Sequence, residues 1–433
     1  MIFRFGNISS LQFFQLLRFS VFLLIGIIFT KTGLEKTEIG QYELILFISG
    51  AVSFFWLNGL IQGLLPVFQE TDEKSPQLFN IFVLLSVFTV FVGGFLVFFG
   101  KPFSNVFLDH PEIPFLKYLL AYLFFSVPAS LVEYIYLLKD KARSMVWYGC
   151  ISFSLMLVLV SAPVVFGFTV RYALGGLVAA SAIRYAWLIV LLLKYSAWRL
   201  SFSFLAEHLK LSAPLIISSF LSGSAQYIDG FIVSSRFDEQ TFAVFRYGAR
   251  EFPLVILLAN AFSSAMIPRF QEKKRPEAAL QEIKMYSTRL MHFLFPLSAI
   301  MLSVTHWLFP IVFNTGFRDS ATIFNIYLLL ITSRLIFPQT ILIGLKKTNA
   351  IAMASFLEIT LNISLSLWFV KLWGIPGIAY ATIVAYLFEK IFLASYLVKK
   401  TGISPRKYLN ISLHMVYSLL LMVVFYYIEF VIY

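Results

Sequence analysis

The feature that most constrains the fold of this 433-residue chain is a series of apolar runs of about 20 residues or more. An α-helix rises 1.5 Å per residue and satisfies its own backbone hydrogen bonds, so runs of this length are typical of helices that cross a hydrocarbon layer. We therefore expect an all-α polytopic membrane protein with about 13 transmembrane helices. The predicted segments are 11–30, 42–66, 78–99, 115–138, 146–166, 173–193, 211–233, 242–267, 290–313, 322–345, 350–370, 375–397 and 409–432.

Basic residues are unevenly distributed between the two sides of these segments. If the N-terminus is cytoplasmic, 20 of the 34 Lys and Arg residues fall in cytoplasmic segments, 8 in outer loops and 6 inside the spans. Cytoplasmic loops retain basic residues, so this orientation is favoured. The net charge of +12 is then explained by topology and by contact with anionic membrane lipids, and no nucleic-acid partner is expected.

Two pairs of similar segments recur about 200 residues apart. The second and eighth predicted helices end in Leu65–Glu70 and Ile267–Glu272, whose prolines are offset by 202 (268 minus 66). The sixth and twelfth helices open with Gly176–Tyr185 and Gly377–Tyr386, at an offset of 201 (377 minus 176). Motifs repeated at a nearly constant offset indicate a duplication, although chance similarity between apolar sequences is the alternative.

The duplication predicts three parts of the chain. We expect an N-terminal six-helix bundle over 1–200, a C-terminal six-helix bundle over 201–400, and one extra transmembrane helix within 401–433. The alternative for the last segment is a helix lying in the membrane interface. Because six is even, the two bundles enter the membrane with the same orientation, an arrangement that places cargo between them.

Five arginines lie inside the apolar segments: Arg18, Arg184, Arg246, Arg250 and Arg334. A guanidinium remains charged at any biological pH and is costly in hydrocarbon, so such residues are expected to face a protein-lined cavity. Several of them together favour an anionic, phosphate-bearing cargo, because the arginine fork donates two hydrogen bonds to phosphate oxygens. Arg184 and Arg334, which lie deepest in their spans, are the first candidates for diphosphate binding.

The other three arginines have competing interpretations. Arg18 lies nearer a span end, where it either contributes to diphosphate binding or extends to the cytoplasmic headgroups. Arg246 and Arg250 are four residues apart, which places them on one face of a helix. They contact either cargo or a carboxylate such as Asp229 or Glu251, and the structural ion pair is favoured.

Further candidates are carboxylates and amides within the spans. Glu358, midway along the eleventh span, is a possible site for coupling transport to an ion, although such carboxylates are more often partners of arginines. Polar residues that would line a cavity, or hydrogen-bond between helices, are Asn58, Gln62, Gln226 and Asn260. The sequence does not identify a coupling ion.

Several segments resemble one family of exporters. Gln226–Val233, Phe245–Pro253 and Gly374–Ala379, together with the proline-terminated second and eighth helices, are similar to the polysaccharide-transporter and O-antigen flippase branch of the multidrug/oligosaccharidyl-lipid/polysaccharide exporter superfamily. The resemblance implies two six-helix bundles forming a cavity. It also implies movement of a polyprenyl-diphosphate-linked oligosaccharide from the inner to the outer leaflet of a bacterial cytoplasmic membrane. The expected partners are membrane lipids, glycosyltransferases and a polysaccharide polymerase.

Two other function classes are considered. A membrane glycosyltransferase or polymerase would also bind lipid diphosphate, but it would be expected to carry a long outer loop or an acidic catalytic cluster. A multidrug antiporter of the same superfamily would need carboxylates for cationic drugs, without five arginines inside the spans. The chain has no nucleotide-binding Gly-Lys-Ser/Thr loop, and its five His lack metal-ligand spacing, so neither a catalytic site, a cofactor nor a metal is expected.

Overall fold

The protein folds into helices arranged in two compact units. The computed structural model describes residues 7–64, 68, 74–108, 110–267, 276–345 and 347–433, and among these no β-strand is formed. The first unit comprises residues 1–227 and 234–243, and the second comprises residues 228–233 and 244–433. The predicted all-α membrane fold is thereby confirmed.

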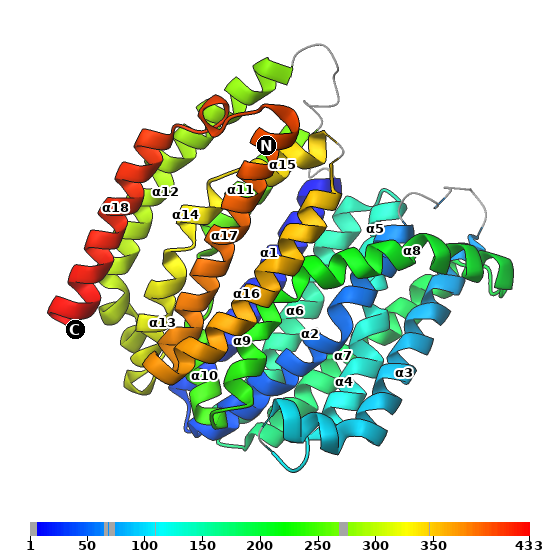
Figure 1. Cartoon of the computed structure of the whole chain (residues 1–433). Coiled ribbons are helices and arrows are strands. Elements are labelled where there is room, and N and C mark those ends of the chain that lie inside the picture. Colours follow the sequence, from blue (N-terminus) through cyan, green and yellow to red (C-terminus); the bar gives the residue numbers. More distant parts are fainter. Residues whose placement is uncertain (1–6, 65–67, 69–73, 109, 268–275, 346) are drawn as a thin grey trace, which may run out of the picture. The chain divides into compact units, whose positions relative to one another are not determined.

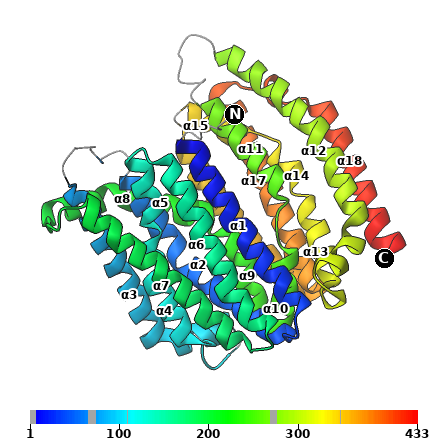
Figure 2. The same ribbon diagram turned by 180° about the vertical axis from the view of Figure 1, so that it is seen from behind.

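The first unit is built around long, apolar helices that pack side by side. Within it α1 packs against α6, α6 and α4 against α7, and α2 against α8. The pairing of α3 with α4 is visible in Figure 1, and the pairing of α1 with α6 in Figure 2. The helices that lie wholly within it are α1 (Asn7–Lys31), α2 (Lys36–Leu64), α3 (Pro76–Phe107), α4 (Leu116–Ala129), α5 (Leu131–Leu138), α6 (Ala142–Val165), α7 (Val170–Tyr195) and α8 (Phe202–Gly223).

The second unit contains shorter and more interrupted helices. Its main pairings are α16 with α17, and α12 with α18 and α13. Its elements are α11 (Pro253–Met266), α12 (Pro276–Val312), η2 (Thr315–Phe317), α13 (Asp319–Leu328), α14 (Ile331–Arg334), α15 (Pro338–Gly344), α16 (Asn349–Trp373), α17 (Ile375–Thr401), η3 (Pro405–Lys407), α18 (Ile411–Tyr427) and η4 (Ile428–Ile432). Two short helices, α9 (Ala225–Ser234) and α10 (Glu239–Gly248), contribute residues to both units.

The described helices account for most of the predicted spans. Eleven are long and apolar enough to cross a membrane, and the bent pair Asp319–Arg334 and Pro338–Gly344 makes twelve. The difference from the predicted thirteen arises at 242–267, because this segment is interrupted between α10 and α11. The last predicted span, 409–432, corresponds to α18 and η4.

The predicted duplication was inferred from similar sequence motifs, and it stays a prediction. Much of the two matching helix exits, at 65–67, 69–70 and 268–272, lies outside the described residues. The other matched pair, Gly176 and Gly377, shares one local feature. A Cβ atom added at either glycine would overlap a backbone carbonyl, that of Leu159 or that of Phe369 respectively. Each glycine therefore allows its helix to lie very close to the preceding one.

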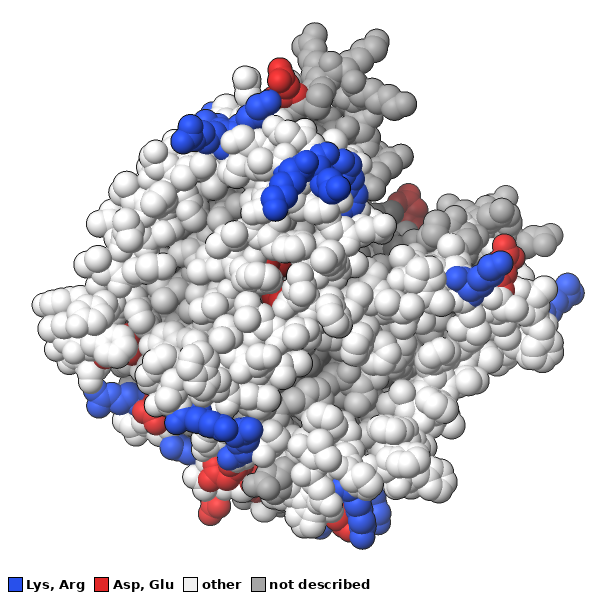
Figure 3. Space-filling view, in the orientation of Figure 1, with Lys and Arg blue, Asp and Glu red and all other residues white. Residues whose placement is uncertain are grey.

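The surface fits a hydrocarbon environment. Figure 3 shows few charged side chains over most of the visible face. Large apolar side chains are exposed on the long helices, for example Phe98 at 82% and Val190 at 61%. A soluble protein rarely exposes apolar area on this scale, whereas lipid tails solvate it.

Adjacent glycines on α7 provide a test of this packing. We expect Gly176→Ala to lower the free energy of unfolding by about 1–3 kcal/mol, because its methyl group would overlap the Leu159 carbonyl. Gly175→Ala is the matched control, since nothing lies within 4 Å of its added Cβ. Thermal unfolding of both variants in detergent measures the effect. Equal melting temperatures would show that α6 and α7 do not pack as closely as described.

Candidate functional site

Two spans of the second unit are interrupted within the apolar segments, each immediately before a proline. The first interruption lies between Gly248 and Pro253, and the second lies between Arg334 and Pro338. A residue that precedes proline is disfavoured in the α conformation, and Phe252 accordingly adopts an extended one. Irregular backbone at membrane depth is tolerated where it is buried in protein or lines a wet cavity, so these interruptions are natural places for a polar site.

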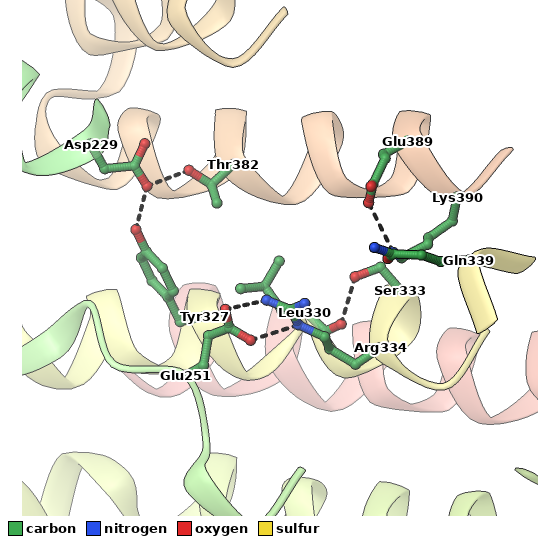
Figure 4. Close-up of polar contacts among 10 residues, drawn as sticks. All are labelled: Asp229, Glu251, Tyr327, Leu330, Ser333, Arg334, Gln339, Thr382, Glu389 and Lys390. Atoms are coloured by element: carbon green, nitrogen blue, oxygen red, sulfur yellow. Dashed lines mark hydrogen bonds and ion pairs between the residues drawn. The ribbon is translucent and has the colours of Figure 1, made fainter. Parts of the chain in front are cut away.

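A bidentate ion pair joins the two interruptions (Figure 4). Arg334 Nε donates to Glu251 Oε2 at 2.8 Å, and Arg334 Nη2 donates to Glu251 Oε1 at 2.5 Å. The guanidinium carbon also lies 4.7 Å from the centre of the Tyr386 ring. These contacts orient the guanidinium and use two of its three nitrogens, and Nη1 is the nitrogen outside the pair.

Arg334 and Lys390 together line a small polar cavity. Its volume is about 60 Å³, which is room for a few water molecules or one phosphoryl group. Lys390 Nζ lies 2.9 Å from Glu389 Oε2 and donates to Gln339 Oε1 at 3.4 Å. The other polar residues lining the cavity are Asn260, Ser263, Gln339 and Thr340. The predicted candidates Arg334 and Asn260 are thus brought together.

A second polar cluster in this unit surrounds Asp229. Its Oδ2 accepts hydrogen bonds of 2.5 Å from the hydroxyls of Tyr327 and Thr382 (Figure 4). Asn362 donates to the Thr382 hydroxyl, and Ser366 donates to Asn362. Asp229 is 4% exposed, and its Oδ1 has no hydrogen-bond partner among the described residues.

Glu358 is buried and interacts with both of these groups. Its side chain belongs to α16 and is 5% exposed, with Oε1 lacking a hydrogen-bond partner in the described part of the chain. It interacts electrostatically with Glu389 and Asp229, which repel its charge, and with Lys390 and Arg334, which attract it. The charges of both clusters therefore act on the Glu358 carboxylate.

The first unit holds its own buried cation, Arg184. Its Nε donates to the Tyr148 hydroxyl at 3.0 Å, and its guanidinium carbon lies 5.4 Å from the centre of the Phe153 ring. Arg184 is 7% exposed and interacts electrostatically with Glu133, which is 2% exposed and has Oε2 without a partner among the described residues. Arg184 therefore faces the protein interior, together with a buried carboxylate.

The remaining arginines differ in their surroundings. Arg18 is half-buried on α1 and interacts electrostatically with Glu133, so it belongs to the same charged group as Arg184. Arg246 lies in the last turn of α10, whereas Arg250 lies in the interruption that follows and donates to the Arg246 carbonyl, so the prediction that both lie on one face of a helix is wrong. The predicted pairing of Arg246 and Arg250 with Asp229 or Glu251 stays a prediction.

Three of the four amides predicted to line a cavity lie in the first unit. Asn58 and Gln62 are exposed and four residues apart on α2, and Gln226 is exposed on α9. Exposed amides on apolar helices indicate a wet surface, because lipid cannot hydrogen-bond them. Their role in cargo binding stays a prediction.

Several residues of the second-unit site were missed from the sequence. Gln339, Thr340, Ser263 and Lys390 were not predicted as site residues. One signal was available: the Phe-Pro pairs at 252–253 and 337–338 each follow a charged residue, Glu251 or Arg334, within three positions, whereas those at 295–296 and 309–310, inside the unbroken α12, do not. A proline there interrupts the helix and supplies the irregular backbone on which a polar site is built.

Comparisons with solved structures show which fold this is. The inward closed conformation of the lipid II flippase MurJ superimposes with a TM-score of 0.68 at 15% identity, over 96% of this chain and 98% of that one. An inward-facing multidrug resistance MATE family transporter of the MOP superfamily gives a TM-score of 0.59 at 13% identity, over 88% and 95%. The fold is therefore that of the MOP-superfamily transporters.

The family follows from the sequence itself. Residues 34–322, more than half of the chain, match the polysaccharide biosynthesis protein family. The chain belongs to that family, and the resemblance inferred from its motifs is confirmed at this level. No curated protein matches the chain.

Proposed function

We propose that this protein is a flippase that moves a polyprenyl-diphosphate-linked oligosaccharide from the cytoplasmic to the outer leaflet of a bacterial cytoplasmic membrane by alternating access. The observation that carries the proposal is the cavity in the second unit, where Arg334 and Lys390 lie beside two interrupted spans. Interrupted helices at membrane depth are a common way to build a transporter site. The family and the fold support a transporter, and no enzymatic activity is assigned to it.

The chemistry of the cavity suits a phosphate group. A lipid diphosphate must leave water to cross the membrane, and an uncompensated charge there is very costly. The Arg334 guanidinium has five N–H donors, two of which bind Glu251, and it also hydrogen-bonds to Tyr386, while the Lys390 ammonium is a second cation at the same cavity. A volume of about 60 Å³ admits a phosphoryl group but no sugar, so in this conformation the glycan would lie outside it.

Arg184 and Arg18 form the proposed second phosphate site, in the first unit. The guanidinium of Arg184 is fixed by Tyr148 and is accompanied by Glu133. A phosphate could compete with that carboxylate for the arginine as the protein changes conformation. The competing idea, a multidrug antiporter, calls for a cargo cavity in which carboxylates outnumber cations, whereas Arg334 and Lys390 are the charged residues that line this one.

A strain that lacks this chain tests the proposal. We expect it to accumulate the lipid-linked oligosaccharide in the cytoplasmic leaflet and to lose surface polysaccharide, and we expect the wild-type gene to restore both. Glycosyltransferases and a polymerase are the proposed partners of the pathway. Normal distribution of the lipid-linked glycan, together with raised sensitivity to cationic drugs, would instead establish the antiporter.

We further propose that Glu358 couples transport to an ion gradient. Because its buried carboxylate interacts with both the Asp229 cluster and the Arg334 cavity, neutralising it changes the balance of charge at each. In proteoliposomes we expect an imposed proton or sodium gradient to accelerate wild-type flipping. We expect Glu358→Gln to flip at a rate that the gradient does not change.

The control for this experiment is Glu112→Gln. Glu112 pairs with Lys101 at 3.1 Å, and its side chain is 69% exposed, so its replacement should leave the response to the gradient intact. A gradient response in Glu358→Gln equal to that of the wild type would assign coupling to another group.

A further inference from the structure

A second, larger cavity lies away from the Arg334 site, within the second unit. Its volume is about 570 Å³, and its wall is mostly aromatic. The aromatic side chains are Phe369, Trp373, Tyr380, Phe425 and Phe430, and Glu429 is the acidic residue among the lining residues. A mostly apolar wall with one charged group is the usual composition of a site for an amphipathic ligand.

Glu429 is held in place by neighbouring helices. Asn325 Nδ2 donates to its Oε1 at 2.6 Å, and His306 Nε2 lies 2.7 Å from the same oxygen. The side chains of Glu429 and His306 are each 5% exposed. The Thr322 hydroxyl, which also lines the cavity, hydrogen-bonds to the carboxylate as well. The acid is thus fixed at the cavity instead of moving freely on a surface.

The cavity lies at one end of three spans, which places it at headgroup depth. Trp373 is the last residue of α16, Tyr380 lies within two turns of the start of α17, and Phe430 belongs to η4 at the end of the last span. Trp and Tyr concentrate at this depth in membrane proteins. Trp373 and Phe430 are 53% and 62% exposed, so the rim of the cavity is apolar and faces lipid. Such a rim disfavours a free sugar and favours a lipid.

The charges near the cavity fit a zwitterion. Glu429 supplies a negative charge, and aromatic faces such as those of Trp373 and Tyr380 attract cations. A positive charge is connected to this acid by a chain of contacts, because the Arg318 guanidinium is 5.5 Å from the centre of the Tyr433 ring, and that ring stacks at 4.1 Å on His306, which contacts Glu429. A headgroup with an ammonium and a phosphate could satisfy both charges at once.

We propose that this cavity binds a phospholipid with a primary ammonium, that is, phosphatidylethanolamine, with its ammonium on Glu429 and its phosphate toward Arg318. The three N–H donors of a primary ammonium can hydrogen-bond to the carboxylate, which a quaternary ammonium cannot do. This inference concerns a site other than the proposed cargo site, and it does not depend on the flippase function.

Native mass spectrometry of the purified full-length protein tests the proposal. The probes are phosphatidylethanolamine, phosphatidylcholine and phosphatidylglycerol, each added in detergent at equal concentration. We expect the wild type to retain one phosphatidylethanolamine at least about tenfold more tightly than either other lipid, and Glu429→Gln to lose that preference. Glu277→Gln is the control, since its side chain is 84% exposed and should leave the preference unchanged.

A second variant separates binding from folding. Trp373→Ala removes an aromatic wall but leaves the contacts of Glu429 with Asn325 and His306, so it should weaken phosphatidylethanolamine retention without loss of folded protein. Equal retention of the three lipids by the wild type would overturn the proposal. So would an undiminished preference in folded Glu429→Gln, or undiminished phosphatidylethanolamine retention by folded Trp373→Ala.

Discussion

Arg334→Ala is expected to reduce polysaccharide export by about 100-fold or more while the protein still reaches the membrane. The reason is that Arg334 is the residue that both lines the polar cavity and anchors one span interruption to the other through Glu251. Arg334→Lys should retain a small part of the activity, because lysine keeps the charge but lacks the fork. Surface polysaccharide, measured in a strain whose only copy carries the variant, gives the result.

Two further variants distinguish cargo binding from structural support. Arg334→Ala leaves Glu251 without its partner, so the double variant Arg334→Ala/Glu251→Gln should recover any lost protein without recovering export. The matched control is Arg289→Ala, since Arg289 is an exposed arginine on α12 that stacks on Tyr286. Export at the wild-type level in Arg334→Ala, or in the double variant, would remove Arg334 from the diphosphate site.

The second large effect is expected at Arg184. Arg184→Ala removes the hydrogen bond to Tyr148 and one of the two arginines that act on the buried Glu133 carboxylate, and such a loss costs about 1–3 kcal/mol of stability. We therefore expect less folded protein. Adding Glu133→Gln should restore most of it, because the uncompensated charge is then gone. Membrane abundance and thermal unfolding measure this part of the prediction.

Export in the same double variant decides the role of Arg184. If Arg184 binds diphosphate, Arg184→Ala/Glu133→Gln should be abundant but inactive in export. Glu133→Gln alone is the control, and it should keep the arginine and its hydrogen bond to Tyr148. Normal export by the abundant double variant would mean that Arg184 only stabilises the first unit.

The sequence predicted the membrane fold well, because the length of an apolar run decides whether a helix can cross a hydrocarbon layer. The predicted spans 11–30, 350–370 and 375–397 lie within α1, α16 and α17. The prediction differed at 242–267, where hydropathy remained high through the interruption before Pro253. Average hydropathy does not register the local effect of proline on the backbone, so Phe252-Pro253 was the signal to read.

The candidate site was only partly predictable. Arg334, Asp229 and Glu358 were selected because charge is costly within a span, and that argument needs no tertiary information. Which charge pairs with which could not be derived, because Glu251 and Arg334 are 83 residues apart in sequence. Helices that are apolar on every side also carry no periodicity that distinguishes a cavity-facing side from a lipid-facing one. Lys390, Gln339 and Ser263 therefore emerged only from the structure.

The most direct test of the central claim is the affinity of the purified protein for three polyprenyl lipids that differ only at the head: diphosphate, monophosphate and uncharged alcohol. The account predicts that the wild type binds the diphosphate at least about tenfold more tightly than the alcohol, and that Arg334→Ala loses this preference while remaining folded. Equal affinity of the wild-type protein for the diphosphate and the alcohol would contradict the account.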